Sequence, residues 1–175
     1  APMDSIDEKI LTILKLNART KITHIAKEIH LSETSVIERI RKLENSGVIK
    51  QYTAVIDYEK IGMDITALTY VRVEHPKYND EFIRHMRAHP EISDVHYITG
   101  DYDFFLKIVT KSSSSLQRVL NDIKCAPGVS LTRSNVVLST WKNNFSVVSP
   151  SDPAGSGAPD AETVGEAGNR KESQQ

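Results

Sequence analysis

Cysteine and long apolar runs are scarce in this sequence. Its 175 residues include a single cysteine, Cys125, which excludes a disulfide within the chain and suits a reducing cytoplasm. No apolar run approaches the about 20 residues that span a bilayer, and the first residues lack the apolar core of a signal peptide. We therefore expect a cytoplasmic protein that does not enter a membrane.

Sequence patterns that indicate catalysis or a metal site are also missing. No glycine-rich phosphate loop is present, and no base can be assigned to the serines of 112–115. His85 and His89 have the i, i+4 spacing of zinc ligands on a helix, but no HExxH pattern and no third ligand accompany them. Cys125 stands at a predicted helix end without an evident activating neighbour. We expect no enzyme, no metal ion and no organic cofactor.

The net charge of −1 conceals an uneven distribution of charge along the chain. Residues 16–50 carry seven Lys and Arg against four Asp and Glu, whereas residues 149–175 carry two against five. The last segment is rich in Pro, Gly and Ser and cannot bury enough apolar surface to offset the entropy lost on ordering. We predict a disordered acidic tail over 149–175. The basic bias near the N-terminus is small, so one copy should bind nucleic acid weakly, which favours a dimer or a larger assembly.

The first 60 residues predict three helices followed by a short extended segment. The first helix begins after Asp4 or Ser5, the second begins after Thr23, and Ser32 caps the third. The run 48–56 is rich in β-branched residues with partial alternation, as expected of a small hairpin or wing. The apolar positions at helical spacing are Ile6, Ile10, Leu11, Ile13, Leu14, Ile25, Ala26, Ile29, Val36, Ile37, Ile40 and Leu43.

Residues 63–146 contain two similar segments separated by 37 residues, in which Pro90 corresponds to Pro127. Each segment predicts a strand, a helix, a turn marked by proline and a second strand, so together they predict a βαββαβ domain with both helices on one face of a four-stranded sheet. The predicted strands, over 67–74, 95–99, 104–110 and 131–140, are apolar on both faces, which favours dimerisation by packing of sheet against sheet. The corresponding apolar pairs are Leu68 with Phe105, Val71 with Ile108, Phe82 with Val119, Ile83 with Leu120, and Met86 with Ile123.

Residues 23–46 fit a helix-turn-helix, whose second helix enters the major groove of DNA. Ala26 is small enough for a close helix crossing, and His30 stands at a turn position where glycine is frequent. Residues near the start of the second helix are expected to reach base edges, and those further along are expected to contact phosphates. The predicted DNA-binding residues are Ser32, Thr34, Ser35, Glu38, Arg39, Arg41 and Lys42. The same pattern also fits a plain three-helix bundle whose charged face is only solvated.

Short motifs occur in one order along residues 4–146. They are IDEKIL at 6–11, NAR at 17–19, IA at 25–26, LSETSV at 31–36, RIRKLE at 39–44, GVI at 47–49 and TGDYD at 99–103. With these motifs the chain resembles the leucine-responsive regulator/asparagine regulator (Lrp/AsnC) family, also called feast/famine regulators. The resemblance implies a transcription regulator with an N-terminal winged helix-turn-helix and a ferredoxin-like (RAM-type) C-terminal domain. It also implies a homodimer formed through that domain and further assembly, typically into octamers.

The resemblance further implies that an amino acid or a related small molecule binds between subunits at the loop of Thr99, Gly100, Asp101, Tyr102 and Asp103. Glycine permits a tight turn, either aspartate could hold an α-amino group, and the tyrosine could form one wall of the pocket. The serines of 112–115 begin a predicted helix, whose free N–H groups suit a carboxylate. Alternatively, the loop is a simple hairpin turn and the serines are an ordinary helix cap.

These observations together predict an α+β protein with four segments. They are a winged helix-turn-helix at 1–50, a hairpin strand or linker at 51–62, a ferredoxin-like domain for effector binding and dimerisation at 63–148, and the acidic tail at 149–175. The expected function is sequence-specific binding of double-stranded DNA under the control of an amino-acid-like effector. The competing interpretation is a metabolite-binding regulatory domain that acts on a protein partner without specific DNA binding.

Overall fold

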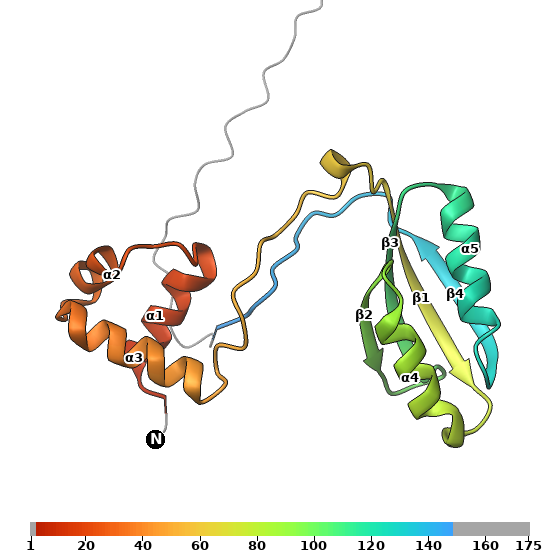
Figure 1. Cartoon of the computed structure of the whole chain (residues 1–175), viewed down its shortest axis with the longest axis horizontal. Helices are drawn as coiled ribbons and strands as arrows, with labels where there is room; N and C mark the ends of the chain where they lie inside the picture. The colour runs from red at the N-terminus through yellow and green to blue at the C-terminus, as the bar shows by residue number, and fades with distance from the viewer. Residues whose placement is uncertain (1–2, 149–175) are drawn as a thin grey trace, which may run out of the picture. The chain divides into compact units, whose positions relative to one another are not determined.

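The computed structural model of the chain describes residues 3–148 (Figure 1). The predicted acidic tail at 149–175 lies outside the described residues. The chain divides into two compact units, and the boundary between Tyr52 and Thr53 falls inside the predicted linker of 51–62. No helix among residues 3–148 is long and apolar enough to cross a bilayer.

Three helices form the first unit, as the apolar spacing predicts. Their order and bounds are α1 (Ser5–Leu16), α2 (Ile22–Ile29) and α3 (Glu33–Asn45). Each helix turns its apolar face toward the other two, because isolated helices of this length gain most of their stability from such packing. The buried core consists of Ile10, Ile25, Ala26, Val36 and Leu43.

Polar residues just outside α1 and α3 define where these helices begin. The Asp4 carboxylate accepts the backbone N–H of Asp7, and the Asp7 carboxylate accepts the backbone N–H of Asp4, which is a capping box. The Ser32 hydroxyl accepts the backbone N–H of Ser35 at the start of α3. Both helix starts therefore follow from local sequence.

His30 ends α2 in a left-handed conformation, with φ 56° and ψ 45°. It is the one residue other than glycine with positive φ in the described part of the chain. Its backbone N–H is donated to the carbonyl groups of Ala26 and Lys27, which closes the turn toward α3. A β-carbon in this conformation costs about 1 kcal/mol relative to glycine.

His30→Gly is expected to raise the free energy of unfolding of the first unit by up to about 1 kcal/mol, because glycine relieves the crowding but loses more chain entropy. His30→Val should lower it, since β-branched residues tolerate this conformation least. Amide hydrogen exchange in α2 and α3 of the full chain measures both changes. Faster exchange in the glycine variant would contradict the strain that we assign to His30.

The run 48–56 does not form the predicted hairpin or wing. It contains no strand, and Val55 and Ile56 are exposed. A strand requires a second segment to receive its backbone hydrogen bonds, and no described segment pairs with this run. The run is held instead at two points, where the backbone N–H of Ile49 is donated to Leu43 at 3.1 Å and the Tyr52 hydroxyl is donated to Glu44 at 2.8 Å.

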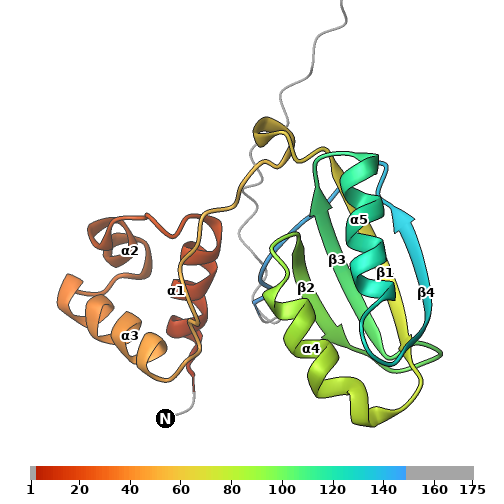
Figure 2. The ribbon, with the colours of Figure 1, turned by 45° about the vertical axis from the view of Figure 1, so that its right-hand side comes forward.

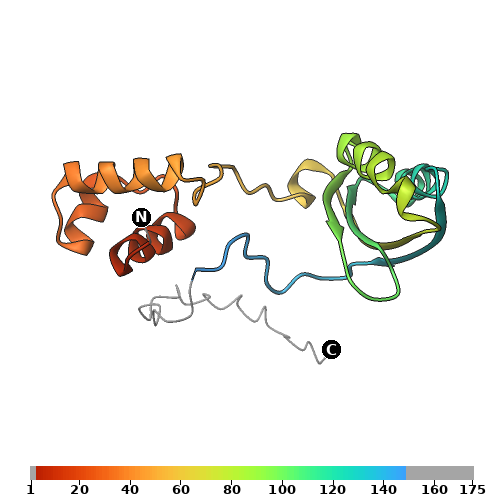
Figure 3. The ribbon, with the colours of Figure 1, turned by 90° about the horizontal axis from the view of Figure 1, so that it is seen from below.

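The second unit is a four-stranded antiparallel sheet with the order β2-β3-β1-β4 (Figure 1). Helices α4 and α5 lie together on one face of this sheet, which Figures 2 and 3 show from two further directions. The predicted βαββαβ architecture is therefore confirmed. The elements are β1 (Ile65–Val73), α4 (Asn79–Ala88), β2 (Ile92–Tyr97), β3 (Phe104–Thr110), α5 (Ser113–Lys124) and β4 (Val129–Val136), with short 3-10 helices at Glu59–Ile61 and Pro76–Tyr78.

The last strand is shorter than predicted, because its partner ends. A strand over 131–140 was expected, but β4 ends at Val136. Since β1 begins at Ile65, only one further backbone bond joins the two segments, from the Val137 N–H to the Thr66 carbonyl at 2.8 Å. Beyond that bond no neighbouring strand is present in the described chain.

The two repeated segments occupy equivalent places in the core, as their spacing predicts. Phe82 on α4 and Val119 on α5 are both fully buried, and Met86 and Ile123 occupy the next turn of each helix. On the strands, Val71 and Ile108 are buried in the same cluster. This core fixes β1 and β3 as the central strands of the sheet, and the β2–β3 loop leads into β3.

The other face of the sheet carries aromatic and charged residues and no helix from the described chain (Figure 3). Tyr70 on β1 lies opposite Phe105 on β3, with ring centroids 5.1 Å apart. Arg133 on β4 and His96 on β2 extend this row across the sheet, and both are exposed. The row leaves half-buried rings in contact with solvent in a single copy of the chain.

Candidate nucleic-acid interface and effector loop

The solvent-facing side of α3 carries most of the residues predicted to contact DNA. Thr34 and Glu38 are exposed in the first half of the helix, and Arg41 and Lys42 are exposed in the second half. None of these four side chains forms an ion pair or hydrogen bond with another described residue. The face therefore offers two cations and two hydrogen-bonding side chains to a partner.

Ser32 and Ser35 act on the helix itself. The Ser32 hydroxyl caps α3, and the two hydroxyl oxygens lie 2.9 Å apart. A capped helix start has fewer free N–H groups, but it is held in a fixed position. These two serines consequently position the exposed face of α3, whether or not they also touch DNA.

Arg39 is less exposed than Arg41 and Lys42, with which it was grouped as a predicted DNA contact, and it is paired within the chain. Its Nη1 lies 2.8 Å from Asp4 and 2.8 Å from Asp7, whose residue exposure is only 3%. The Asp7 N–H and then the Arg39 guanidinium hold the pKa of Asp4 below its usual value. Arg39 therefore fastens α3 to the start of α1.

The β2–β3 loop is shaped by Gly100 and closed by Asp103. Gly100 has φ 109°, a conformation that side chains rarely adopt. The Asp103 carboxylate accepts the backbone N–H of Val73 at 2.7 Å, and the Asp103 N–H is donated to Val71 at 2.9 Å. Asp103 thus anchors the loop to β1, and its carboxylate is already engaged.

Other predicted members of the loop remain open to solvent. Thr99 and Asp101 are exposed, and Tyr102 is half-buried. The Tyr102 ring packs against Tyr70, with centroids 5.5 Å apart. The structure thus separates the two aspartates, because one anchors the loop and the other faces outward.

Arg72 is a neighbour of this loop that the sequence did not indicate. Its Nε donates a hydrogen bond to the Asp101 carbonyl at 2.8 Å, and its guanidinium lies 5.6 Å from the centre of the Tyr102 ring. Arg72 precedes the loop by almost 30 residues and belongs to another strand. Only the pairing of β1 with β3 brings Arg72 to the β2–β3 loop, and no local sequence motif predicts that pairing.

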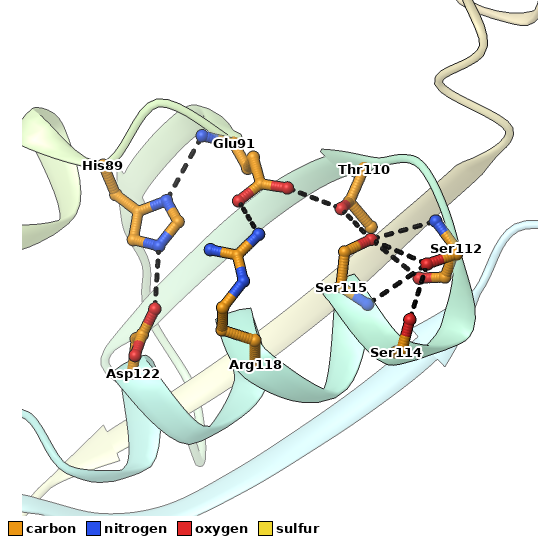
Figure 4. A network of polar contacts seen from close by, with 8 residues as sticks. All are labelled: His89, Glu91, Thr110, Ser112, Ser114, Ser115, Arg118 and Asp122. Carbon is orange, nitrogen blue, oxygen red and sulfur yellow. Dashed lines mark hydrogen bonds and ion pairs between the residues drawn. The ribbon is translucent and has the colours of Figure 1, made fainter.

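The serines of 112–115 form a helix cap, one of the two alternatives that the sequence allowed (Figure 4). Ser112 and Ser115 make a capping box at the start of α5. The Thr110 hydroxyl lies 2.6 Å from both the Ser115 hydroxyl and the Glu91 carboxylate, and Glu91 also accepts a bond from Arg118 at 2.7 Å. The Thr110 hydroxyl and Arg118 hold the pKa of Glu91 below its usual value, against the effect of its partial burial. A carboxylate of the chain itself is therefore already bound beside this helix start.

The same network joins α5 to the turn that follows α4 (Figure 4). The Nε2 atom of His89 lies 3.2 Å from Asp122 on α5, and its Nδ1 accepts the backbone N–H of Glu91. No group of three His, Cys, Asp or Glu side chains that could hold a metal ion occurs in residues 3–148.

Comparison with known families covers both units. A family model of the AsnC-type helix-turn-helix domain matches residues 3–44, and one of the Lrp/AsnC ligand binding domain matches residues 66–147. The chain belongs to the Lrp/AsnC family. This Lrp/AsnC protein is accordingly a transcription regulator, with a helix-turn-helix DNA-binding domain and a ligand-binding domain.

Named relatives agree with this assignment. The HTH-type transcriptional regulator FL11 of Pyrococcus horikoshii is 43% identical over 141 residues, which are 81% of this chain and 93% of that protein. The regulator LysM of Sulfurisphaera tokodaii is 38% identical over 81% of this chain and 99% of its own length.

Solved structures of related proteins share the fold of this Lrp/AsnC chain. The structure of LrpC from Bacillus subtilis has a TM-score of 0.73 at 30% identity and covers 81% of this chain and 99% of that one. The transcriptional regulator NMB0573 of Neisseria meningitidis, solved as a complex with L-Met, has a TM-score of 0.79 at 25% identity and covers 83% of this chain and 96% of its own.

Proposed function

We propose that this regulator binds duplex DNA as a homodimer through α3 and that an amino acid bound at the β2–β3 loop changes its DNA binding or its assembly. The observation that carries the proposal is that some polar side chains of α3 are bound within the first unit and others are not. Arg39 is bound to the acids of α1, whereas the four exposed residues predicted to contact DNA have no side-chain partner in the described chain. A helix that is anchored to α1 on one side and has unpaired polar side chains on the other suits insertion into the major groove of DNA.

The exposed residues of α3 differ in what they are suited to contact. Thr34 and Glu38 lie toward the helix start, where side chains reach base edges, and a glutamate can accept a hydrogen bond from the cytosine amino group. Arg41 and Lys42 lie further along and suit phosphates, whose contacts set the position of the protein but not its sequence preference. Glu38 should therefore affect which operator is chosen, and the two cations should affect how tightly any duplex is bound.

Lys42→Ala is expected to weaken binding to every duplex by a similar factor and to reduce the slope of log affinity against log salt by roughly two, because one phosphate contact is lost in each copy of the dimer. Glu38→Ala should instead change the ranking of duplexes. Fluorescence anisotropy with selected genomic fragments at several salt concentrations measures both effects.

Lys124→Ala is the matched control, since Lys124 is exposed at the end of α5 and its loss removes the same charge. Equal losses in the Lys42 and Lys124 variants would contradict the role given to α3. A native protein that ignores duplex DNA at low salt would favour the competing function, a metabolite-binding domain that acts on a protein partner.

Dimerisation is supported by the face of the sheet that carries Tyr70 and Phe105. These rings are only half-buried in one copy, and burying them against a second sheet would remove apolar surface from water. Two copies also double the number of cations that contact DNA, which the small basic bias of the first unit requires. We extend the proposal to higher assembly, such as an octamer, and light scattering of the purified protein tests both states.

The effector site is proposed on the exposed part of the loop at Thr99, Gly100 and Asp101, with Tyr102 beside it. The support is the free carboxylate of Asp101, together with the L-Met complex of a protein that has the same fold. Asp103 supports the loop, since one of its carboxylate oxygens accepts the Val73 N–H, and it is half-buried, so Asp101 is the more accessible acid.

Asp101→Asn is expected to lower the affinity for the amino acid roughly tenfold or more, since a charge-assisted hydrogen bond to the α-ammonium group is lost. Asp103→Ala should mainly lower stability, by about 1–2 kcal/mol, because it leaves the Val73 N–H without an acceptor. Titration calorimetry and thermal unfolding separate the two outcomes. An amino-acid affinity that is unchanged in the Asp101 variant would remove this residue from the site.

A further inference from the structure

Arg72 stands at the end of β1 in a position fixed by the β2–β3 loop. Its Nε is donated to the Asp101 carbonyl at 2.8 Å, and the Tyr102 ring lies 5.6 Å from its guanidinium. The Tyr102 ring is itself held by Tyr70 at 5.5 Å. A long side chain on an exposed strand position is normally free to rotate, so these contacts restrict Arg72 to one orientation.

The charge of Arg72 is nevertheless not neutralised. In the described chain no carboxylate lies within ion-pair distance of its guanidinium. The Nε bond uses one edge of the planar group, and the two Nη atoms keep the forked edge that pairs with carboxylates. Arg72 is exposed, so this edge is accessible to a ligand.

Asp101 places the opposite charge next to this arginine. Its carbonyl holds Arg72, whereas its carboxylate is exposed and has no partner within residues 3–148. The other loop acid, Asp103, is half-buried and one of its oxygens accepts the Val73 N–H, so it is less accessible than Asp101. Arg72 and Asp101 thus present one cation and one anion at the same loop, neither paired within residues 3–148, and these match the two charged ends of a free amino acid.

We infer that Arg72 binds the α-carboxylate of the effector with its Nη atoms, while the Asp101 carboxylate binds the α-ammonium group. This inference rests on the proposed amino-acid effector site and adds to it a residue from β1 and a division of roles. It requires a ligand with a free carboxylate. An amino acid whose carboxylate is converted to a carboxamide keeps its ammonium group and side chain but offers Arg72 no anion.

The experiment compares free amino acids with their amides. Thermal shifts of the native full-length protein with each standard L-amino acid identify those that bind. Calorimetry then measures the affinity of the native protein and of Arg72→Met for one such amino acid and for its carboxamide. We expect Arg72→Met to lose roughly tenfold to hundredfold in affinity for the acid and less than about twofold for the amide.

Two further variants keep the outcome interpretable. Arg72→Lys keeps the charge but loses the Nε bond and the fork, so its affinity for the acid should fall between those of the native protein and the methionine variant. Arg84→Met removes the same charge from an exposed position on α4 and should leave both affinities unchanged.

A parallel loss for acid and amide would show that Arg72 only shapes the loop, and would overturn the inference. Unchanged affinity for the acid in Arg72→Met would do the same while leaving the effector site in place. If no amino acid binds the native protein, both the inference and the proposed effector fail, whereas the proposed binding of DNA by α3 is tested separately and would stand.

Discussion

Replacing Arg39 and Arg41 with alanine is expected to give opposite results, although the two residues lie two positions apart on α3. Arg39→Ala should lower the free energy of unfolding of the first unit by about 2–3 kcal/mol, because the buried Asp7 carboxylate loses its cation. Arg41 is exposed and unpaired in the described chain, so Arg41→Ala should change stability by less than about 0.5 kcal/mol.

For DNA binding the order should be the opposite, with the larger effect in Arg41→Ala and the smaller one in Arg39→Ala. Arg41→Ala should weaken the affinity for duplex DNA by roughly tenfold, since a phosphate contact is lost in each copy. Arg39→Ala should stay within about twofold of the native affinity at temperatures where it is folded. Hydrogen exchange in α1 and α3 measures the first pair of effects, and fluorescence anisotropy measures the second.

Arg39→Lys provides a graded control, because it keeps a cation near Asp7 without the planar guanidinium. It should lose less stability than the alanine variant. A folded Arg39→Ala protein that no longer binds DNA would return Arg39 to the DNA-contacting face. Equal stabilities of the Arg39 and Arg41 variants would show that the contacts with Asp4 and Asp7 contribute little.

Gly128→Ala is expected to lower the free energy of unfolding of the second unit by about 2–4 kcal/mol. Gly128 has φ 78°, which a side chain rarely adopts. In addition, a β-carbon at this position would overlap the ring of Tyr78. The variant therefore combines backbone strain with a steric overlap in the packed region between β4 and the turn after β1.

Gly62→Ala separates the two causes. Gly62 has a similar φ of 75° but no atom within 4 Å of the place where a β-carbon would lie. It should cost only about 1 kcal/mol, the part due to conformation. Urea unfolding of the full chain followed by circular dichroism measures both variants.

The double variant Gly128→Ala with Tyr78→Ala tests the overlap directly. If the ring is the obstacle, the two substitutions should cost less together than the sum of their separate costs. Additive costs would assign the whole effect of Gly128→Ala to its backbone conformation.

Much of the fold could be predicted because its signals are local or periodic. Helical spacing and the caps at Asp4 and Ser32 locate the three helices of the first unit. The repeat of 37 residues predicts the paired core positions, such as Phe82 and Val119, and with them the order of strands and helices. Neither inference requires knowledge of long-range contacts.

The sequence did not reveal contacts between segments that are far apart along the chain. Arg39 was grouped with the exposed arginine and lysine that follow it, although it lies three residues after Val36 and four before Leu43. That spacing places it beside the buried stripe, and only the acids of α1 explain why a cation is tolerated there. No sequence spacing indicates the role of Arg72, because its contact with Asp101 depends on the register between strands.

The predicted wing failed for a different reason. Residue types in 48–56 favour an extended backbone, but the run contains no strand. Pairing, however, is a property of two segments, and one β-rich run does not reveal whether its partner lies in the same chain.

The 37-residue repeat places Glu91 and Gly128 at equivalent positions, and the two halves of the sheet domain use them differently. In one half Glu91 reaches the start of α5 through Thr110 and Arg118, whereas in the other Gly128 makes room for Tyr78. Because the pKa of Glu91 is lowered in the folded protein, its contribution is complete at neutral pH and disappears as acid titrates it. Gly128 has no side chain to titrate, so the two equivalent positions of the repeat respond differently to acid.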